Sequence, residues 1–176
     1  MKKVYKEIVG ITGASGILGK YFIKKYKNKF DFRIFKKRIE KNKDLEFWIK
    51  KNKNIKIFIH MAAIASISEA SKSTKKTYLI NSLSSIKLLK LIKKLNLRHL
   101  KYFLFISSSH IYKPSFNPIS ENSKKLPANI YGRSKLKVEK YINKNTKNFN
   151  FQIGVARIFN YYSKNQKKGF FIPDIK

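Results

Sequence analysis

The chain has 176 residues, which is long enough for one domain. Apolar residues make up 43% of it, which is too many for a wholly disordered chain. It contains no cysteine, which excludes disulfides and cysteine–zinc sites and is typical of a reducing compartment. Lysine and arginine number 41 against 9 acids, a net charge of +32. A polyanion partner is one explanation of this charge. Because the lysines are spread over every segment, we favour a drift in amino-acid composition as its cause.

No apolar run reaches the roughly 20 residues that a membrane span needs. Met1-Lys2-Lys3 faintly resembles the start of a signal peptide, but Lys6 and Glu7 interrupt it, and the following glycine-studded stretch suits a buried strand. We therefore expect a cytoplasmic protein with no membrane partner. We also expect no metal site.

Apolar strands alternate with amphipathic helices along the chain. A helix from Asp44 would take that residue as its N-cap, and prolines mark 112–129 as a loop. The alternation predicts βαβ units, and so an α/β fold with a doubly wound parallel sheet and helices on both faces. Ligands in such sheets bind beyond the carboxyl ends of the strands. The predicted strands are 4–12, 30–35, 55–61, 102–106 and 149–158, and the predicted helices are 17–26, 44–51, 73–95 and 130–143.

A glycine-rich motif follows the first predicted strand. Residues 10–19 read GITGASGILG, with Gly13, Gly16 and Gly19 between strand and helix. Gly13 and Gly16 permit a tight turn and let a pyrophosphate approach the backbone, whereas Gly19 lets the helix pack closely. The helix N-terminus adds unpaired N–H groups. A plain glycine turn is the alternative, but the position after the first strand favours a nucleotide cofactor.

The tip of the second predicted strand bears on the choice of cofactor. An acid there would bond the ribose hydroxyls of NAD, but the chain has Phe35-Lys36-Lys37-Arg38 instead. Cations suit the extra phosphate of NADP, so NADP is mildly preferred over NAD.

Two further motifs follow the fourth strand and the proline loop. Residues 106–112 read ISSSHIY, while Tyr131 and Lys135 lie four apart, on one face of a helix. A lysine charge beside a phenol lowers the tyrosine pKa, so Tyr131 would exchange a proton with a substrate hydroxyl or carbonyl. A nearby serine hydroxyl would bond the same oxygen. Each signal alone also arises by chance, but their order along the chain favours a redox site.

These motifs resemble those of the NAD-dependent epimerase/dehydratase family, the extended short-chain dehydrogenases/reductases. Residues 12–19 resemble its TGxxGxxG, residues 60–63 its HxAA, and residues 157–160 its RxFN segment. The resemblance implies a Rossmann-like NAD(P)-binding domain over residues 1–176. It further implies oxidation–reduction of a nucleotide sugar, the expected partner, with hydride exchanged with the nicotinamide.

The resemblance also assigns site residues. Ser108, four residues before Tyr112, matches the catalytic serine, and Tyr131 and Lys135 match the YxxxK pair. Contacts to the substrate are implied for Ser109, His110 and Asn160. Contacts to the cofactor are implied for Gly13, Ser15, Gly16, Ile17, Leu18, Gly19, Lys36, Asp44, Leu45, Ala62, Ala63, Asn81, Tyr131, Lys135 and Phe159.

Two departures from the family pattern matter. Family dehydratases typically carry a glutamate two residues after the catalytic serine, where this chain has His110, which leaves a 4-epimerase or a 4-keto-sugar reductase. His110 is either a proton donor or a histidine bonded at a strand end. The family's substrate-binding portion should begin near 170–173, so we expect that lobe to be truncated or on another chain, and activity of this chain alone is in question.

A function of another class stays open. The charge and the short C-terminal portion also fit a catalytically incomplete cofactor-binding module or a nucleic-acid-binding basic module. No motif for RNA or DNA is visible, so nucleic acid is not the expected partner. Family members often form homodimers through the two helices expected here at 73–95 and 130–143.

Overall fold

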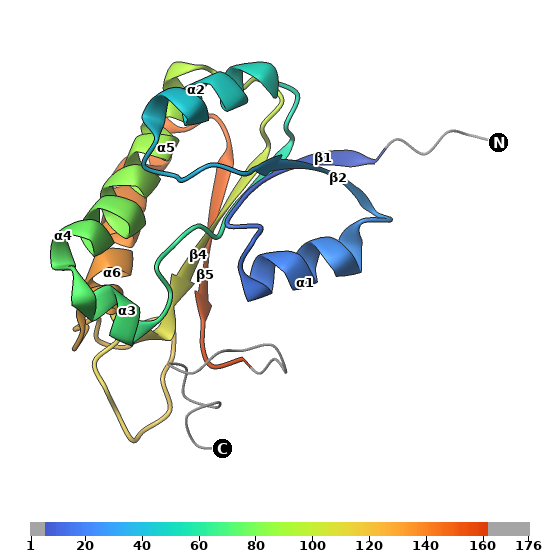
Figure 1. The fold of residues 1–176 in the computed structure, drawn as a ribbon. Helices are drawn as coiled ribbons and strands as arrows, with labels where there is room; N and C mark the ends of the chain where they lie inside the picture. The colour runs from blue at the N-terminus through green and yellow to red at the C-terminus, as the bar shows by residue number, and fades with distance from the viewer. Residues whose placement is uncertain (1–5, 162–176) are drawn as a thin grey trace.

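The computed structural model describes residues 6–161. These residues form a parallel sheet of five strands in the order β2-β1-β3-β4-β5 (Figure 1). The predicted Rossmann-like α/β fold is thereby confirmed, while the expectations for residues 1–4 and 170–176 lie outside the described residues. The strands are β1 Glu7–Thr12, β2 Phe30–Phe35, β3 Ile57–His60, β4 Tyr102–Ser108 and β5 Gln152–Ile158.

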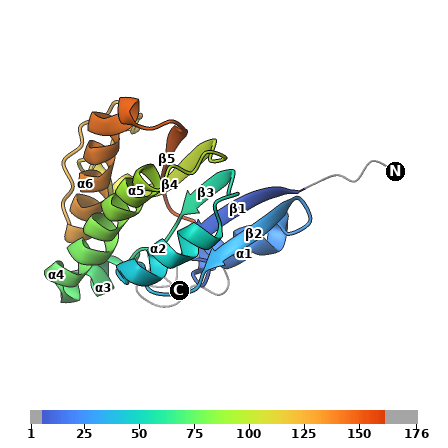
Figure 2. The same ribbon diagram turned by 90° about the horizontal axis from the view of Figure 1, so that it is seen from above.

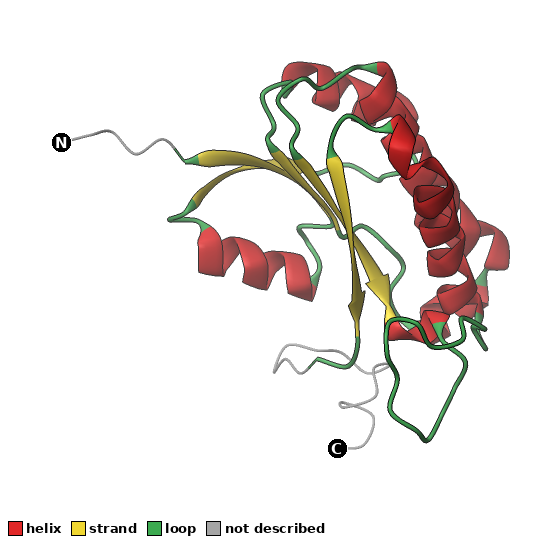
Figure 3. Ribbon diagram, turned by 180° about the vertical axis from the view of Figure 1, so that it is seen from behind, coloured by secondary structure: helices red, strands yellow, loops and turns green. Residues whose placement is uncertain are grey.

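Helices cover both faces of the sheet. Helix α1 (Ile17–Tyr26) packs on one face, and α2 (Asn42–Lys51), α5 (Ser84–Lys94) and α6 (Ile130–Asn145) lie on the other (Figures 1 and 3). Helices α5 and α6 lie side by side (Figure 2). Among the helices between residues 6 and 161, none combines the length and apolar character that crossing a membrane requires. The shorter helical segments are α3 Ile67–Lys72, α4 Thr74–Thr77, η2 Ser109–Ile111 and η3 Thr146–Asn148.

The sheet separates two apolar cores. The larger core contains Phe58, Phe103 and Phe105, which have no exposed surface, and the first two rings stack 5.4 Å apart. Alternate residues of a strand face opposite sides, so Leu104 and Ile106 pack in the smaller core beside α1. Strand β4 therefore contributes to both cores, which explains its nearly continuous apolar sequence.

The start of α2 differs from its prediction. The helix begins at Asn42 after the N-cap Lys41, so the expected N-cap role of Asp44 is wrong. Asp44 lies within the first turn instead, where its negative charge still complements the helix dipole.

The helical stretch predicted over 73–95 is present over 74–94, but it is not α-helical throughout. It consists of α4, a π-helical segment η1 (Tyr78–Leu83) and α5. The π segment carries Asn81, whose amide accepts a hydrogen bond from Ile64 N at 2.8 Å and donates to Ile64 O and to Ser134 Oγ. Local apolar spacing does not reveal this segment, because the partners of Asn81 lie 17 and 53 residues away in the chain.

Candidate active site

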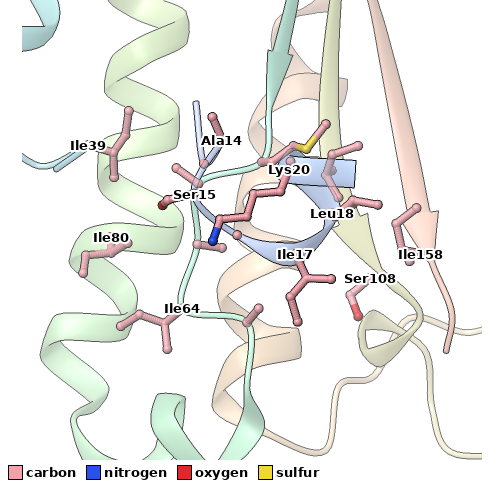
Figure 4. A pocket seen from close by; sticks show the side chains of 18 of the residues that line it. Ala14, Ser15, Ile17, Leu18, Lys20, Ile39, Ile64, Ile80, Ser108 and Ile158 are labelled. Atoms are coloured by element: carbon pink, nitrogen blue, oxygen red, sulfur yellow. The ribbon is translucent and has the colours of Figure 1, made fainter. Parts of the chain in front are cut away.

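A groove of about 1630 Å³ follows the carboxyl ends of the strands. Strand β2 is added on one side of β1, and β3 is added on the other side, so the strand order switches between β1 and β3. Doubly wound sheets bind ligands at such a switch point. Figure 4 shows Ile17, after the glycine turn, between Ile64 on one side and Ser108 and Ile158 on the other, with Ser15 above Ile64. The three sequence motifs therefore meet in one groove.

The glycine turn after β1 depends on contacts that side chains would block. Gly13 has a φ of +76°, and a Cβ there would lie 2.5 Å from Ala62 N. A Cβ at Gly19 would lie 2.5 Å from Gly13 O, so α1 could not approach the turn. A Cβ at Gly16 would meet Gly13 O at 3.3 Å and otherwise the open groove. Gly13 and Gly19 shape the turn, and Gly16 leaves space beside it.

We expect Gly13→Ala to lower the free energy of unfolding by more than about 2 kcal/mol, because alanine disfavours this φ and its methyl group would strike the backbone of Ala62. Gly16→Ala is the matched control, with a loss below about 1 kcal/mol but weaker dinucleotide binding, since its methyl group enters the groove. Urea unfolding and cofactor titration separate the two effects. A Gly13→Ala protein as stable as wild type would contradict this reading of the turn.

A buried histidine ties the glycine turn to the rest of the site. His60 is 1% exposed, with Nδ1 2.6 Å from Thr12 Oγ1 and Nε2 2.8 Å from Ser85 Oγ. Ser85 Oγ donates to Asn81 O, so it accepts from His60 Nε2–H, and Nδ1 accepts from the Thr12 hydroxyl. Burial, with a smaller effect of the Lys135 charge, lowers the pKa of His60 to about 3. His60 is therefore a neutral structural link.

The residues expected to carry the chemistry meet in the groove. Tyr131 and Lys135 lie one turn apart on α6, whose N-terminus is capped by Asn129, with Oδ1 accepting from Gly132 N at 2.8 Å. The side chain of Ser108 lies near enough to the phenol of Tyr131 to lower its pKa. All three of Ser108, Tyr131 and Lys135 line the groove. The structure thus brings the two hydroxyl groups to a common point.

The predicted lowering of the tyrosine pKa by the lysine is wrong for this structure. Burial raises the pKa of Tyr131, the interaction with the Ser108 side chain lowers it, and Tyr161 raises it. Lys135 points elsewhere, since its Nζ donates to Ile106 O at 2.8 Å. Burial also lowers the pKa of Lys135 to about 7. Burial therefore dominates the proton affinities of both groups, which helical spacing alone does not indicate.

Most of the predicted ligand contacts do lie along the groove. They come from the glycine turn, the tip of β2, the segment after β3, the start of α6 and the end of β5. The predicted residues that line it are Gly13, Ser15, Gly16, Ile17, Leu18, Gly19, Lys36, Ala62, Ala63, Ser108, His110, Tyr131, Lys135, Phe159 and Asn160.

Four predicted contact residues do not line the groove: Asp44, Leu45, Asn81 and Ser109. Leu45 is 1% exposed because it packs in the larger core. Asn81 has no exposed surface, and its amide group bonds protein atoms on both sides. Asn81 thereby holds the segment after β3 against α6. The ligand contacts of these four residues stay predictions.

His110 is exposed at the groove, with its ring edge-on to that of Tyr131 at 5.9 Å between centroids. Partial burial lowers its pKa. Within residues 6–161 its ring nitrogens make no hydrogen bond, so a histidine bonded at the strand end is not what the described structure shows. In the same part of the chain no three histidine or acidic side chains gather as metal ligands.

A buried network behind Lys135 was not predicted. The carboxylate of Glu139 accepts from Ser107 Oγ at 2.5 Å and forms an ion pair with Arg157 Nη2 at 2.9 Å. The available signal was the spacing of Lys135 and Glu139, which lie four residues apart and so share a helix face. That spacing alone does not indicate a buried network, because such pairs on helices are usually exposed.

Comparisons with known proteins agree with this geometry. The model of the NAD dependent epimerase/dehydratase family matches residues 9–175. UDP-glucose 4-epimerase from Thermotoga maritima is similar with a TM-score of 0.84 at 19% identity, over 96% of this chain and 61% of that one. dTDP-4-dehydrorhamnose reductase from Bacillus anthracis, in complex with NADP, gives 0.78 at 24% identity, over 94% and 58%. RMD from Pseudomonas aeruginosa, complexed with NADPH, gives 0.79 at 26% identity, over 94% and 58%.

The chain therefore spans 58% to 61% of the length of these three solved structures. No curated protein sequence matches it. Structural likeness at such low identity shows the fold, whereas the family model covers nearly the whole chain. The chain belongs to the NAD-dependent epimerase/dehydratase family.

Proposed function

We propose that this chain is the cofactor-binding part of an NAD(P)-dependent enzyme that acts on a nucleotide sugar, as a 4-keto-sugar reductase or a 4-epimerase. The observation that carries the proposal is that Ser108, Tyr131 and Lys135 line the same groove as the glycine turn. Two similar solved structures are named as a UDP-glucose epimerase and a dTDP-4-dehydrorhamnose reductase, which supports the substrate class.

The groove fits a dinucleotide. Gly16, the N-cap of α1, has no side chain to bond the first N–H groups of the helix, and its open side faces the groove. Those N–H groups and the helix dipole suit a pyrophosphate. Tyr131, Lys135 and Phe159 would hold the other end of the cofactor. When bound, the nicotinamide supplies the hydride chemistry that amino-acid side chains lack.

The chain's own residues would handle the proton. In the proposed reaction the Tyr131 hydroxyl exchanges a proton with the sugar oxygen, and the Ser108 hydroxyl bonds and orients the same oxygen. His110 and Asn160 line the groove and would contact the substrate. The reaction needs no elimination step, in keeping with a histidine at position 110.

We expect NADPH to bind more tightly than NADH. Lys36, Lys37 and Arg38 line the groove at the tip of β2, where cations favour the additional phosphate. Lys36→Glu should weaken NADPH binding and reverse the preference. The matched control is Lys53→Glu, which makes the same charge change at an exposed lysine outside the groove.

Dissociation constants from calorimetry test both the binding of a nicotinamide nucleotide and the preference for NADPH. Millimolar or weaker binding of both nucleotides by the folded wild-type protein would overturn the cofactor proposal. Equal affinity for the two nucleotides would overturn the NADP preference alone. Equal losses in Lys36→Glu and Lys53→Glu would show that net charge, not the tip of β2, governs the binding.

A further inference from the structure

Glu139 is the one acidic side chain that is buried within residues 6–161. It is 2% exposed, in a chain with only 9 acidic residues. A buried carboxylate is costly unless its oxygens are bonded. Here Oε1 accepts from Ser107 Oγ and from Arg157 Nε, and Oε2 accepts from Arg157 Nε and Nη2. Both oxygens of the buried carboxylate are therefore hydrogen-bonded.

Arg157 extends this hydrogen-bond network to the loop before α6. Its Nη1 donates to the hydroxyl of Tyr112 at 2.7 Å and to Glu121 O at 3.0 Å, in the loop before α6. Two residues after Arg157, Phe159 lines the groove. One carboxylate therefore joins β4, the proline-containing loop, α6 and the end of β5.

Lys135 lies one helical turn before Glu139 on α6 and is likewise buried, at 2% exposed. Its Nζ donates to Ile106 O and lies 4.9 Å from the centre of the Phe105 ring, and neither group carries a negative charge. Burial lowers the pKa of Lys135 to about 7, and the charge of Glu139 opposes that shift.

The other titratable groups around this pair do not replace that charge. Tyr131 on α6 and Tyr112 before the loop are phenols, and burial raises the pKa of Tyr131, so it is neutral near pH 7. His60 on β3 is neutral because burial lowers its pKa to about 3. Among the described residues that face Lys135, Glu139 is thus the source of negative charge.

We propose that Glu139 is a positioning residue of the active site: its carboxylate fixes Arg157, and through it the end of β5, against α6, and supplies the negative charge one helical turn from the buried Lys135. The inference rests on the proposed function, in which Lys135 and Phe159 hold the cofactor. It also makes a claim about Lys135 that holds without any ligand.

The direct test is a pH titration of Lys135, monitored by NMR of the full chain with ¹³Cε-labelled lysine. A lysine signal that titrates near 7 in wild type and disappears in Lys135→Met identifies the residue. Glu139→Gln keeps the size of the side chain and removes its charge, so the Lys135 midpoint should fall by about one unit, a tenfold change in its dissociation constant. Glu121→Gln is the control, because its exposed carboxylate lies outside the network and its substitution should leave the midpoint unchanged.

A second variant makes the test independent of the folding of Glu139→Gln. Arg157→Gln removes the cation that is paired with Glu139 and leaves the carboxylate unneutralised, so the Lys135 midpoint should move in the opposite direction, upwards. An unchanged Lys135 midpoint in Glu139→Gln, or a fall in Arg157→Gln, would overturn the inference. If Glu139→Gln does not fold, the direction in Arg157→Gln decides.

Turnover gives a further readout where the wild-type chain is active. The alkaline limb of the kcat profile should move to lower pH in Glu139→Gln by the same tenfold change in proton activity. A uniform loss of kcat with an unmoved profile would show a merely structural role and overturn the inference. Failure of the wild-type protein to bind a nicotinamide nucleotide would instead overturn the proposed function, while the lysine titration would stand.

Discussion

Tyr131→Phe is expected to lower the turnover of a nucleotide sugar by about 10²–10⁴-fold, because it removes the hydroxyl that exchanges a proton with the substrate. Cofactor affinity should stay near the wild-type value, since the ring remains in place. The ring packs against Ala70 and Ile130, and the lost hydroxyl lies near the side chain of Ser108. The free energy of unfolding should therefore change by less than about 1.5 kcal/mol.

Tyr141→Phe provides the control for this experiment. Tyr141 lies on the same helix but outside the groove, so its variant should keep both turnover and cofactor affinity. Steady-state kinetics with UDP- and dTDP-sugars, together with cofactor titration, measure the two effects. Full turnover by Tyr131→Phe would remove the proposed proton-transfer role. Loss of cofactor affinity together with the folded state would assign Tyr131 a structural role.

Acidification is expected to destabilise the fold through His60. Burial lowers its pKa to about 3 in the folded protein, against 6.5 for a free histidine. Below pH 6.5 His60 is protonated in the unfolded chain but stays neutral in the folded chain, so the free energy of unfolding decreases as the pH falls. Between about pH 7 and pH 4 this one residue should remove about 3 kcal/mol from the free energy of unfolding.

Urea unfolding across that pH range measures the effect. His60→Gln lacks the titrating ring, so its stability should fall much less steeply with acidification than that of wild type. His99→Gln is the control, because His99 is exposed and its replacement should leave the wild-type pH dependence intact. Parallel pH dependences for wild type and His60→Gln would contradict the assignment of a neutral, buried histidine.

The fold was predictable because its signals are local. The apolar runs at 30–35 and 102–106 and the glycine turn at 10–19 each specify their own element, and the structure has them where the sequence places them. The π segment at Tyr78–Leu83 escaped prediction, because it depends on the hydrogen bonds of Asn81 to distant residues. The same distant hydrogen bonds give Asn81 a structural role that local spacing does not predict.

The site was predictable in its membership and not in its electrostatics. The spacing of Tyr131 and Lys135 places both on one helix face, and the structure brings Ser108 to the phenol. Spacing does not show how deeply a group is buried, and burial raises the pKa of Tyr131 and lowers that of Lys135. Glu139 was missed for the same reason, since its importance comes from the tertiary contacts with Ser107 and Arg157.

The central claim is that a nicotinamide dinucleotide binds in the groove at the carboxyl ends of the strands. A protein with a net charge of +32 attracts anionic nucleotides over its whole surface, so affinity alone does not locate the site. A ¹⁵N NMR titration with NADPH does. The account predicts saturable shifts in the amides of 13–19, 36–38 and 62–63, around the glycine turn. Weak shifts scattered over the exposed lysines, with the glycine turn unmoved, would contradict it.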